Sequence, residues 1–111
     1  MICKLAGINE IKKDQWYEFN LEIENAPFSL MLQKKNNQYV AFKNYCPHQG
    51  RRMNYSIGKF LTTSEGNIVC PAHGAEFKPD SGLCVNGPCL GSSLEPVHIQ
   101  LNEESIFAII K

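Results

Sequence analysis

Two short stretches in the middle of the chain decide the fold. They read Cys46-Pro47-His48-Gln49-Gly50 and Cys70-Pro71-Ala72-His73-Gly74. Written as spacing, the chain has C-x-H, then 21 residues, then C-x-x-H. Thiolate sulfur and imidazole nitrogen are both good ligands for transition metals. Two such halves on neighbouring loops therefore predict a metal centre with two cysteine and two histidine ligands.

The residues between and after these ligands suit loops that hold a charged cofactor. Pro47 and Pro71 fix φ and remove a backbone donor, which stiffens both loops. Gly50 and Gly74 let the backbone approach closely and offer their N–H groups as donors. The surrounding sequence thus supports the ligand prediction.

The paired motif resembles the Rieske family. In that family each loop sends its cysteine to one iron and its histidine to the other iron of a 2Fe-2S cluster. The resemblance implies one cluster per chain, with Cys46 and Cys70 on the buried iron and with His48 and His73 on the exposed iron. It covers most of the chain and extends to Phe77, to Gly82 and to a Gly87-Pro88 turn, which in the family covers the cluster.

Departures from the family pattern concern the redox potential. High-potential Rieske proteins join the two loops by a disulfide and place a serine and a tyrosine hydroxyl near the cluster. This chain has Arg51 and Ala72 where those cysteines would lie, and Ala75 and Phe77 where the hydroxyls would lie. With fewer donors to the sulfurs, we predict a potential in the lower part of the Rieske range of about −150 to +300 mV.

The resemblance implies a soluble one-electron carrier that passes electrons from a flavin-dependent reductase to a terminal ring-hydroxylating oxygenase. The sequence shows no nucleophile with an adjacent base and no nucleotide-binding glycine loop, so we expect no catalytic apparatus. Two alternatives stay open. One is the small subunit of an assimilatory nitrite reductase, a group whose members often lack some ligands. The other is a structural metal-binding module that holds zinc.

Length and charge narrow the function further. A chain of 111 residues fits a single domain. Eleven basic and eleven acidic residues cancel, so no overall field favours nucleic acid or anionic membrane as a partner. An odd count of five cysteines, with no signal-like start and no membrane-length apolar run, predicts a reducing, cytoplasmic setting.

Short β-branched and aromatic segments separated by polar turns predict an all-β fold. We expect an antiparallel β-sandwich base from residues 1–43 and 95–111, on which a loop-rich cluster-binding subdomain of residues 44–94 is mounted. The expected strands are Cys3–Ala6, Trp16–Ile23, Phe28–Gln33, Tyr39–Lys43, Phe60–Thr63, Ile68–Cys70, Val97–Leu101 and Ile106–Ile110.

Several residues outside the ligand set also carry expectations. Cys84 and Cys89 flank the Gly87-Pro88 turn and are surplus to four ligands, so we expect buried thiols that act as small apolar residues. A disulfide between them is the alternative, which a reducing cytoplasm disfavours. Cys3 and His98 receive no role.

The polar residues that follow His48 are Gln49, Arg51 and Arg52. We expect them around the exposed imidazoles, either steering an acidic partner or forming a plain solvated patch.

Overall fold

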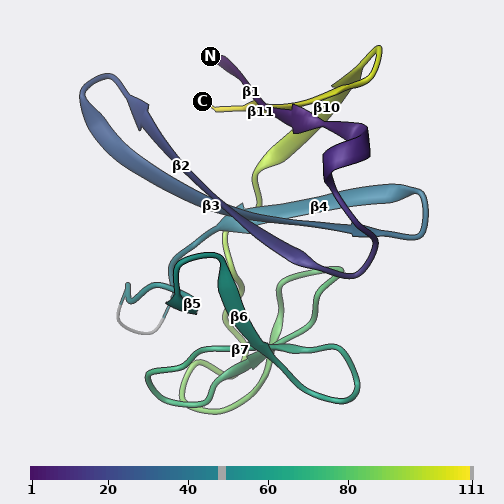
Figure 1. Cartoon of the computed structure of the whole chain (residues 1–111). Coiled ribbons are helices and arrows are strands. Elements are labelled where there is room, and N and C mark those ends of the chain that lie inside the picture. Colours follow the sequence, from purple (N-terminus) through teal and green to yellow (C-terminus); the bar gives the residue numbers. More distant parts are fainter. Residues whose placement is uncertain (48–49, 111) are drawn as a thin grey trace.

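The computed structural model describes residues 1–47 and 50–110. Within them the chain forms strands and a single 3-10 turn, η1 (Ile8–Glu10), and the strands build three antiparallel sheets (Figure 1). No described helix is long and apolar enough to cross a bilayer. The all-β prediction is confirmed.

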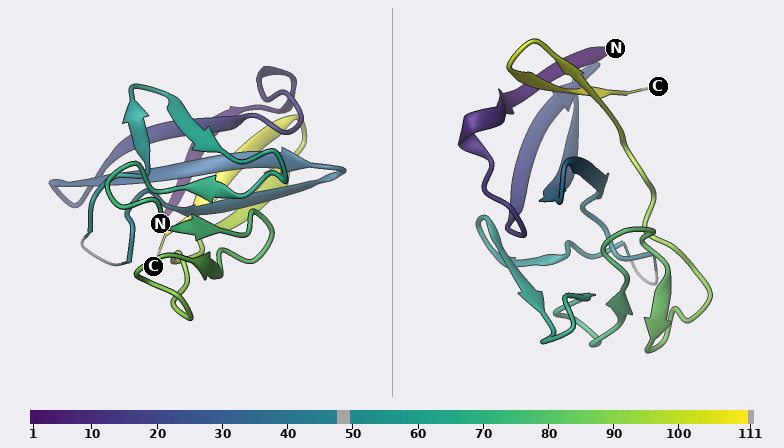
Figure 2. Two further views of the ribbon diagram at one scale, coloured as in Figure 1. Left: turned by 90° about the horizontal axis from the view of Figure 1, so that it is seen from below. Right: turned by 90° about the vertical axis from the view of Figure 1, so that its right-hand side faces the viewer.

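Two of the sheets form the base of the molecule. One has the order β1 (Ile2–Gly7), β11 (Ser105–Ile109), β10 (His98–Asn102), and the other has the order β2 (Trp16–Ile23), β3 (Ala26–Lys35), β4 (Gln38–Lys43). The first and last strands of the chain pair in the first sheet. Both termini therefore lie at the same end of the molecule, as Figures 1 and 2 show.

The third sheet carries the middle of the chain. Its strands follow the chain order, and they are β5 (Asn54–Ser56), β6 (Lys59–Thr62), β7 (Ile68–Val69), β8 (Glu76–Phe77) and β9 (Cys84–Asn86). Long loops join these short strands and lie at the end of the molecule away from the termini (Figure 1). The loop of Cys70 joins β7 to β8, whereas Cys46 lies in the connection from β4 to β5.

Strand β3 separates two hydrophobic cores. Successive side chains of a strand point to opposite faces, so Leu30 and Leu32 enter the core between the two base sheets while Met31 enters a second core below them. Strand β4 repeats the division with Ala41 and Phe42. The sheet β2-β3-β4 is therefore the middle layer, and its far face supports the loops.

Candidate metal centre

The two ligand loops are built by the same hydrogen bonds. The Cys46 N–H donates to the carbonyl of Arg51 (2.6 Å), and the Gly50 N–H donates to the carbonyl of Cys46 (2.8 Å). In the second loop the Cys70 N–H donates to Ala75 (2.8 Å), and the Gly74 N–H donates to Cys70 (2.9 Å). Gly50 and Gly74 have φ values of 68° and 75°, which glycine adopts without strain. The motif C-P-x-x-G is thus accompanied twice by the same pair of backbone hydrogen bonds and the same glycine conformation.

A third loop has the same construction without a cysteine. It reads Lys78-Pro79-Asp80-Ser81-Gly82-Leu83. The Lys78 N–H donates to Leu83 (2.9 Å), and the Gly82 N–H donates to Lys78 (2.8 Å). The pattern x-P-x-x-G-x therefore specifies the turn, and the cysteine at its first position makes two of the three turns candidate ligand loops.

The cysteines and the described histidine of the candidate centre differ in their exposure to solvent. The Cys46 and Cys70 side chains are almost fully buried, at 2% and 1% exposure, and belong to one core. His73 is exposed, and His48 lies outside the described residues. The other buried members of this core are Trp16, Met31, Phe42, Met53, Ile68, Ala75, Phe77, Cys84, Cys89 and Leu94.

Among residues 1–47 and 50–110, no three Cys, His, Asp or Glu side chains gather as ligands of a single metal ion would. A Rieske cluster takes two protein ligands at each of two irons.

Two further thiols lie beside Cys46. Its Sγ is 4.0 Å from that of Cys89, and the Cys89 Sγ is 3.6 Å from that of Cys84. The expectation that Cys84 and Cys89 are buried is confirmed, and both are free thiols. Burial, followed by the hydrogen bond with Cys84 and the proximity of Cys46, raises the pKa of Cys89 to about 12. At neutral pH this thiol keeps its proton.

The Gly87-Pro88 turn packs closely on the second ligand loop. Gly87 has a φ of 100°, and a Cβ atom added to it would lie 2.8 Å from the Cα of Ala75. Ala75 follows Gly74 directly and is fully buried. The turn and the loop of Cys70 are therefore in backbone contact, and only glycine at position 87 permits that approach.

We expect Gly87→Ala to lower the free energy of unfolding by about 2–4 kcal/mol, because it adds overpacking to an unfavourable φ. Urea denaturation would measure the loss. The matched control is Gly91→Ala, since Gly91 likewise has a positive φ, of 91°, but has open space around its Cβ position. Equal losses in the two variants would show that backbone strain alone, and not the contact with Ala75, accounts for the effect.

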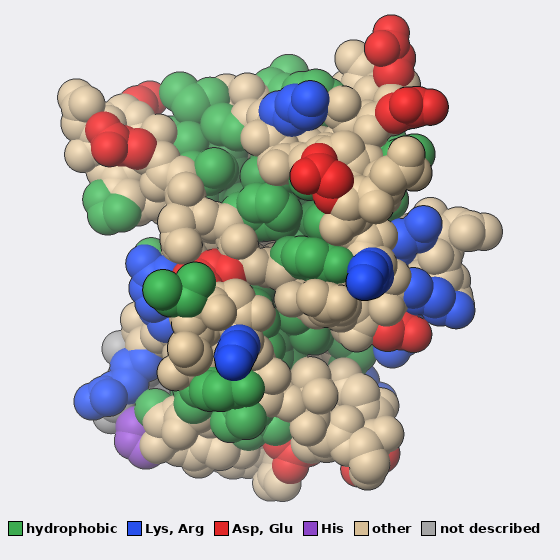
Figure 3. Space-filling model, in the orientation of Figure 1, with side chains coloured by type: hydrophobic (Ala, Val, Ile, Leu, Met, Phe, Trp, Pro, Cys, Tyr) green, Lys and Arg blue, Asp and Glu red, His purple; other side chains and the backbone are tan. Residues whose placement is uncertain are grey.

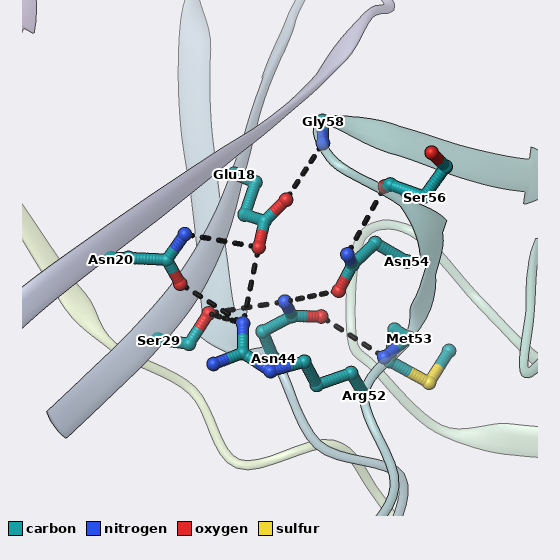
Figure 4. A network of polar contacts seen from close by, with 9 residues as sticks. All are labelled: Glu18, Asn20, Ser29, Asn44, Arg52, Met53, Asn54, Ser56 and Gly58. Atoms are coloured by element: carbon teal, nitrogen blue, oxygen red, sulfur yellow. Dashed lines mark hydrogen bonds and ion pairs between the residues drawn. The ribbon is translucent and has the colours of Figure 1, made fainter.

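A polar network joins the first ligand loop to the base (Figure 4). The Nη1 of Arg52 donates to Glu18 (3.1 Å), to the Oδ1 of Asn20 (3.0 Å) and to the Oγ of Ser29 (3.1 Å). Glu18 also accepts the N–H of Gly58 (2.7 Å). The guanidinium of Arg52 is held by side chains of β2 and β3. The expectation that Arg52 lies around the imidazoles stays a prediction, because His48 lies outside the described residues. Arg51 is exposed, and Gln49 lies outside the described residues.

Asn44 anchors the same network from the start of the ligand loop. Its side chain is fully buried. Its Nδ2 donates to the Oγ of Ser29 (3.1 Å) and to the Oδ1 of Asn54 (2.8 Å), and its Oδ1 accepts the N–H of Met53 (3.1 Å). No sequence motif marked Asn44 or Glu18, since a buried polar residue is recognised by its partners, which the fold alone brings together.

Comparison with known proteins gives a family match over nearly the whole chain. The sequence model of the Rieske [2Fe-2S] domain matches residues 2–103. No curated protein matches the chain significantly.

Solved structures share the fold at low sequence identity. The terminal oxygenase of carbazole 1,9a-dioxygenase from Novosphingobium sp. KA1 has a TM-score of 0.79 at 16% identity, with 98% of this chain but 29% of that chain covered. The ferredoxin of carbazole 1,9a-dioxygenase from Nocardioides aromaticivorans IC177 has a TM-score of 0.75 at 16% identity, covering 100% of this chain and 99% of that chain.

A chain in a complex of reduced oxygenase and oxidised ferredoxin of carbazole 1,9a-dioxygenase has a TM-score of 0.72 at 19% identity, and the coverage is 96% and 91%. The present chain therefore matches less than a third of an oxygenase and nearly all of a ferredoxin.

Proposed function

Because this chain belongs to the Rieske [2Fe-2S] domain family, whose members bind one 2Fe-2S cluster, we propose that it is a one-electron carrier with Cys46, His48, Cys70 and His73 as the cluster ligands. The resemblance seen in the sequence and the expected cofactor are confirmed at the level of the family.

The observation that carries the proposal is the match between the two loops and the donor set. Both cysteines occupy the first position of the same turn, both are buried in one core, and neither forms a disulfide. His73 is exposed. A mixed cysteine and histidine set of this kind fits a Rieske cluster, which takes up and releases one electron when bound.

The residues around the proposed site make one of its sides buried and the other exposed. Met53, Ala75 and Phe77 are fully buried in the same core as the two cysteines, and this core keeps water from the sulfur side. The exposed imidazole of His73 marks the side on which a partner can approach. Electron entry and exit at that one edge imply sequential docking through small interfaces.

The proposed partners are a flavin-dependent reductase and a terminal oxygenase. Support for an oxygenase comes from the full-length likeness to the carbazole 1,9a-dioxygenase ferredoxin, since a chain of that kind is present in a complex with its oxygenase. Basic side chains lie beside a histidine at the lower left of the space-filling view (Figure 3). Arg51, exposed in the loop of Cys46, would favour an acidic surface on the partner.

An EPR-monitored redox titration of the purified protein tests the proposal. We expect a reduced-state spectrum of the mixed histidine and cysteine type, with a midpoint in the lower part of the Rieske range of about −150 to +300 mV. An EPR-silent protein that holds zinc would reject electron transfer and favour a structural metal module.

Replacing an imidazole ligand tests the ligand assignment. We expect His73→Cys to lower the midpoint, because an anionic thiolate replaces a neutral imidazole and disfavours the added electron. The control is His98→Cys, an exposed position on β10 in the base. A midpoint that is the same in both variants, with two irons retained in each, would remove His73 from the ligand set.

A further inference from the structure

Three thiols form a series of two sulfur–sulfur contacts that ends on a proposed cluster ligand. The Sγ of Cys84 is 3.6 Å from the Sγ of Cys89, which is 4.0 Å from the Sγ of Cys46. All three side chains are buried, with 6% exposure or less. Neither Cys84 nor Cys89 is needed as a ligand of a four-ligand cluster. Their position next to Cys46 therefore indicates a different role.

The protonation states of the three cysteines determine which sulfur donates a hydrogen bond and which accepts it. Cys46 acts as a ligand only as the thiolate, which can accept a hydrogen bond but cannot donate one. Cys84 is placed to donate to the carbonyl of Asn86 (3.3 Å) or to the sulfur of Cys89. The Cys89 proton is then directed to the one negatively charged sulfur of the three.

We propose that the Cys89 thiol donates a hydrogen bond to the Cys46 ligand sulfur and thereby raises the midpoint potential of the cluster. This inference rests on the proposed function and deepens it. A donor to a ligand sulfur draws negative charge away from the iron, so it stabilises the reduced state more than the oxidised state. Cys89 would thus supply a donor in a site where Ala75 and Phe77 supply none.

The backbone around Cys89 holds the thiol in place. The Ser92 N–H donates to the carbonyl of Cys89 (2.9 Å), and the Leu90 N–H donates to the carbonyl of Gly87 (3.2 Å). The Cys84 N–H donates in turn to Ser92 (2.8 Å). A weak S–H donor contributes most when its position is fixed and its surroundings are dry, and both conditions hold here.

Two replacements at one position test the inference through the midpoint potential. We expect Cys89→Ala to lower the midpoint because the donor is lost, and Cys89→Ser to raise it because a hydroxyl is a stronger donor of similar size. The control is Cys3→Ala, in strand β1 of the base and away from the ligand loops. The midpoint of this variant should equal that of the wild type. Shifts of the same sign in both Cys89 variants would reject the donor role and indicate altered packing.

A measurement on the unmutated protein covers the case in which a Cys89 variant fails to load its cluster. Infrared spectra should show an S–H stretching band that is absent in Cys89→Ser, that moves on deuteration, and that lies lower in the cluster-loaded protein than in the apoprotein. A Cys89 band unchanged by cluster loading would overturn the proposal.

Failure of this inference is distinguishable from failure of the proposed function. If the wild type lacks the mixed-ligand EPR spectrum, the electron carrier itself is rejected. If the wild type has that spectrum but the two Cys89 variants keep its midpoint, the carrier stands and the donor role falls.

Discussion

Cys70→Ala is expected to abolish cluster binding. Iron should fall from two atoms per chain to background, and the EPR signal of the reduced protein should disappear. Cys70 is a better position for this test than Cys46. The Sγ of Cys89 lies 4.0 Å from that of Cys46, so Cys89 could replace a missing ligand at that position. Among the described residues, no other thiol forms a hydrogen bond with the Cys70 sulfur. Iron analysis, visible absorption and EPR on the purified variant measure the result.

The matched control is Cys84→Ala, a thiol as deeply buried as Cys70, in the same core. It should retain both irons, since Cys84 is not a proposed ligand. Metal binding contributes directly to folding stability, so the melting temperature should fall further in Cys70→Ala than in Cys84→Ala. A Cys70→Ala variant that keeps two irons and its EPR signal would refute the ligand set.

Long strands could be predicted from the sequence because their patterns repeat over several residues. β2 was expected at Trp16–Ile23 and has those bounds, and β3 was expected at Phe28–Gln33 and extends to Ala26–Lys35. β5, β8 and β9 were missed. With two or three residues each, they carry too little alternation to be recognised, and they form because the surrounding loops bring them together.

The turn between β2 and β3 shows a second limit. Glu24 and Asn25 both have positive φ, 52° and 66°, and they close an antiparallel pair that runs to Ile23 and Ala26. Hairpin turns with two positive φ values favour Asn-Gly or Asp-Gly. A glutamate at the first position gave no such signal, so the strand pairing, rather than the turn residues, determines this turn.

The candidate site was predictable to the extent that it depends on side-chain chemistry. The spacing names the two cysteines and two histidines as candidate ligands, which stays a prediction. The burial of Cys84 and Cys89 could be predicted because they are surplus to four ligands, and it is confirmed. The three contacts of Arg52 could not, because Glu18, Asn20 and Ser29 lie at least 23 residues away in sequence and meet Arg52 only in the folded chain. The sequence alone does not show whether a charged residue next to a ligand points into solvent or forms contacts with the base.

Arg52→Ala is the second large effect that we expect, with a loss of about 2–3 kcal/mol in the free energy of unfolding. Its partner Glu18 has a side chain only 5% exposed, whereas the side chain of Arg52 is 44% exposed. Removing one member of a fully buried pair costs about 3–5 kcal/mol, and the partial exposure of Arg52 reduces that cost. Urea denaturation followed by the fluorescence of Trp16, the single tryptophan, would measure it.

The neighbouring Arg51→Ala is the control, since an exposed arginine away from such contacts should change stability by no more than about 0.5 kcal/mol. The double variant Arg52→Ala with Glu18→Gln should lose less than the sum of the single losses, because the neutral amide no longer needs the cation. The Arg52 contacts link the chain that follows the Cys46 loop to β2 and β3, so the Arg52→Ala protein should also lose iron faster under a chelator. Glu18 also accepts hydrogen bonds from the Gly58 N–H and from the Nδ2 of Asn20 (3.1 Å). Equal stability of the two arginine variants would mean that these two donors alone satisfy the buried carboxylate.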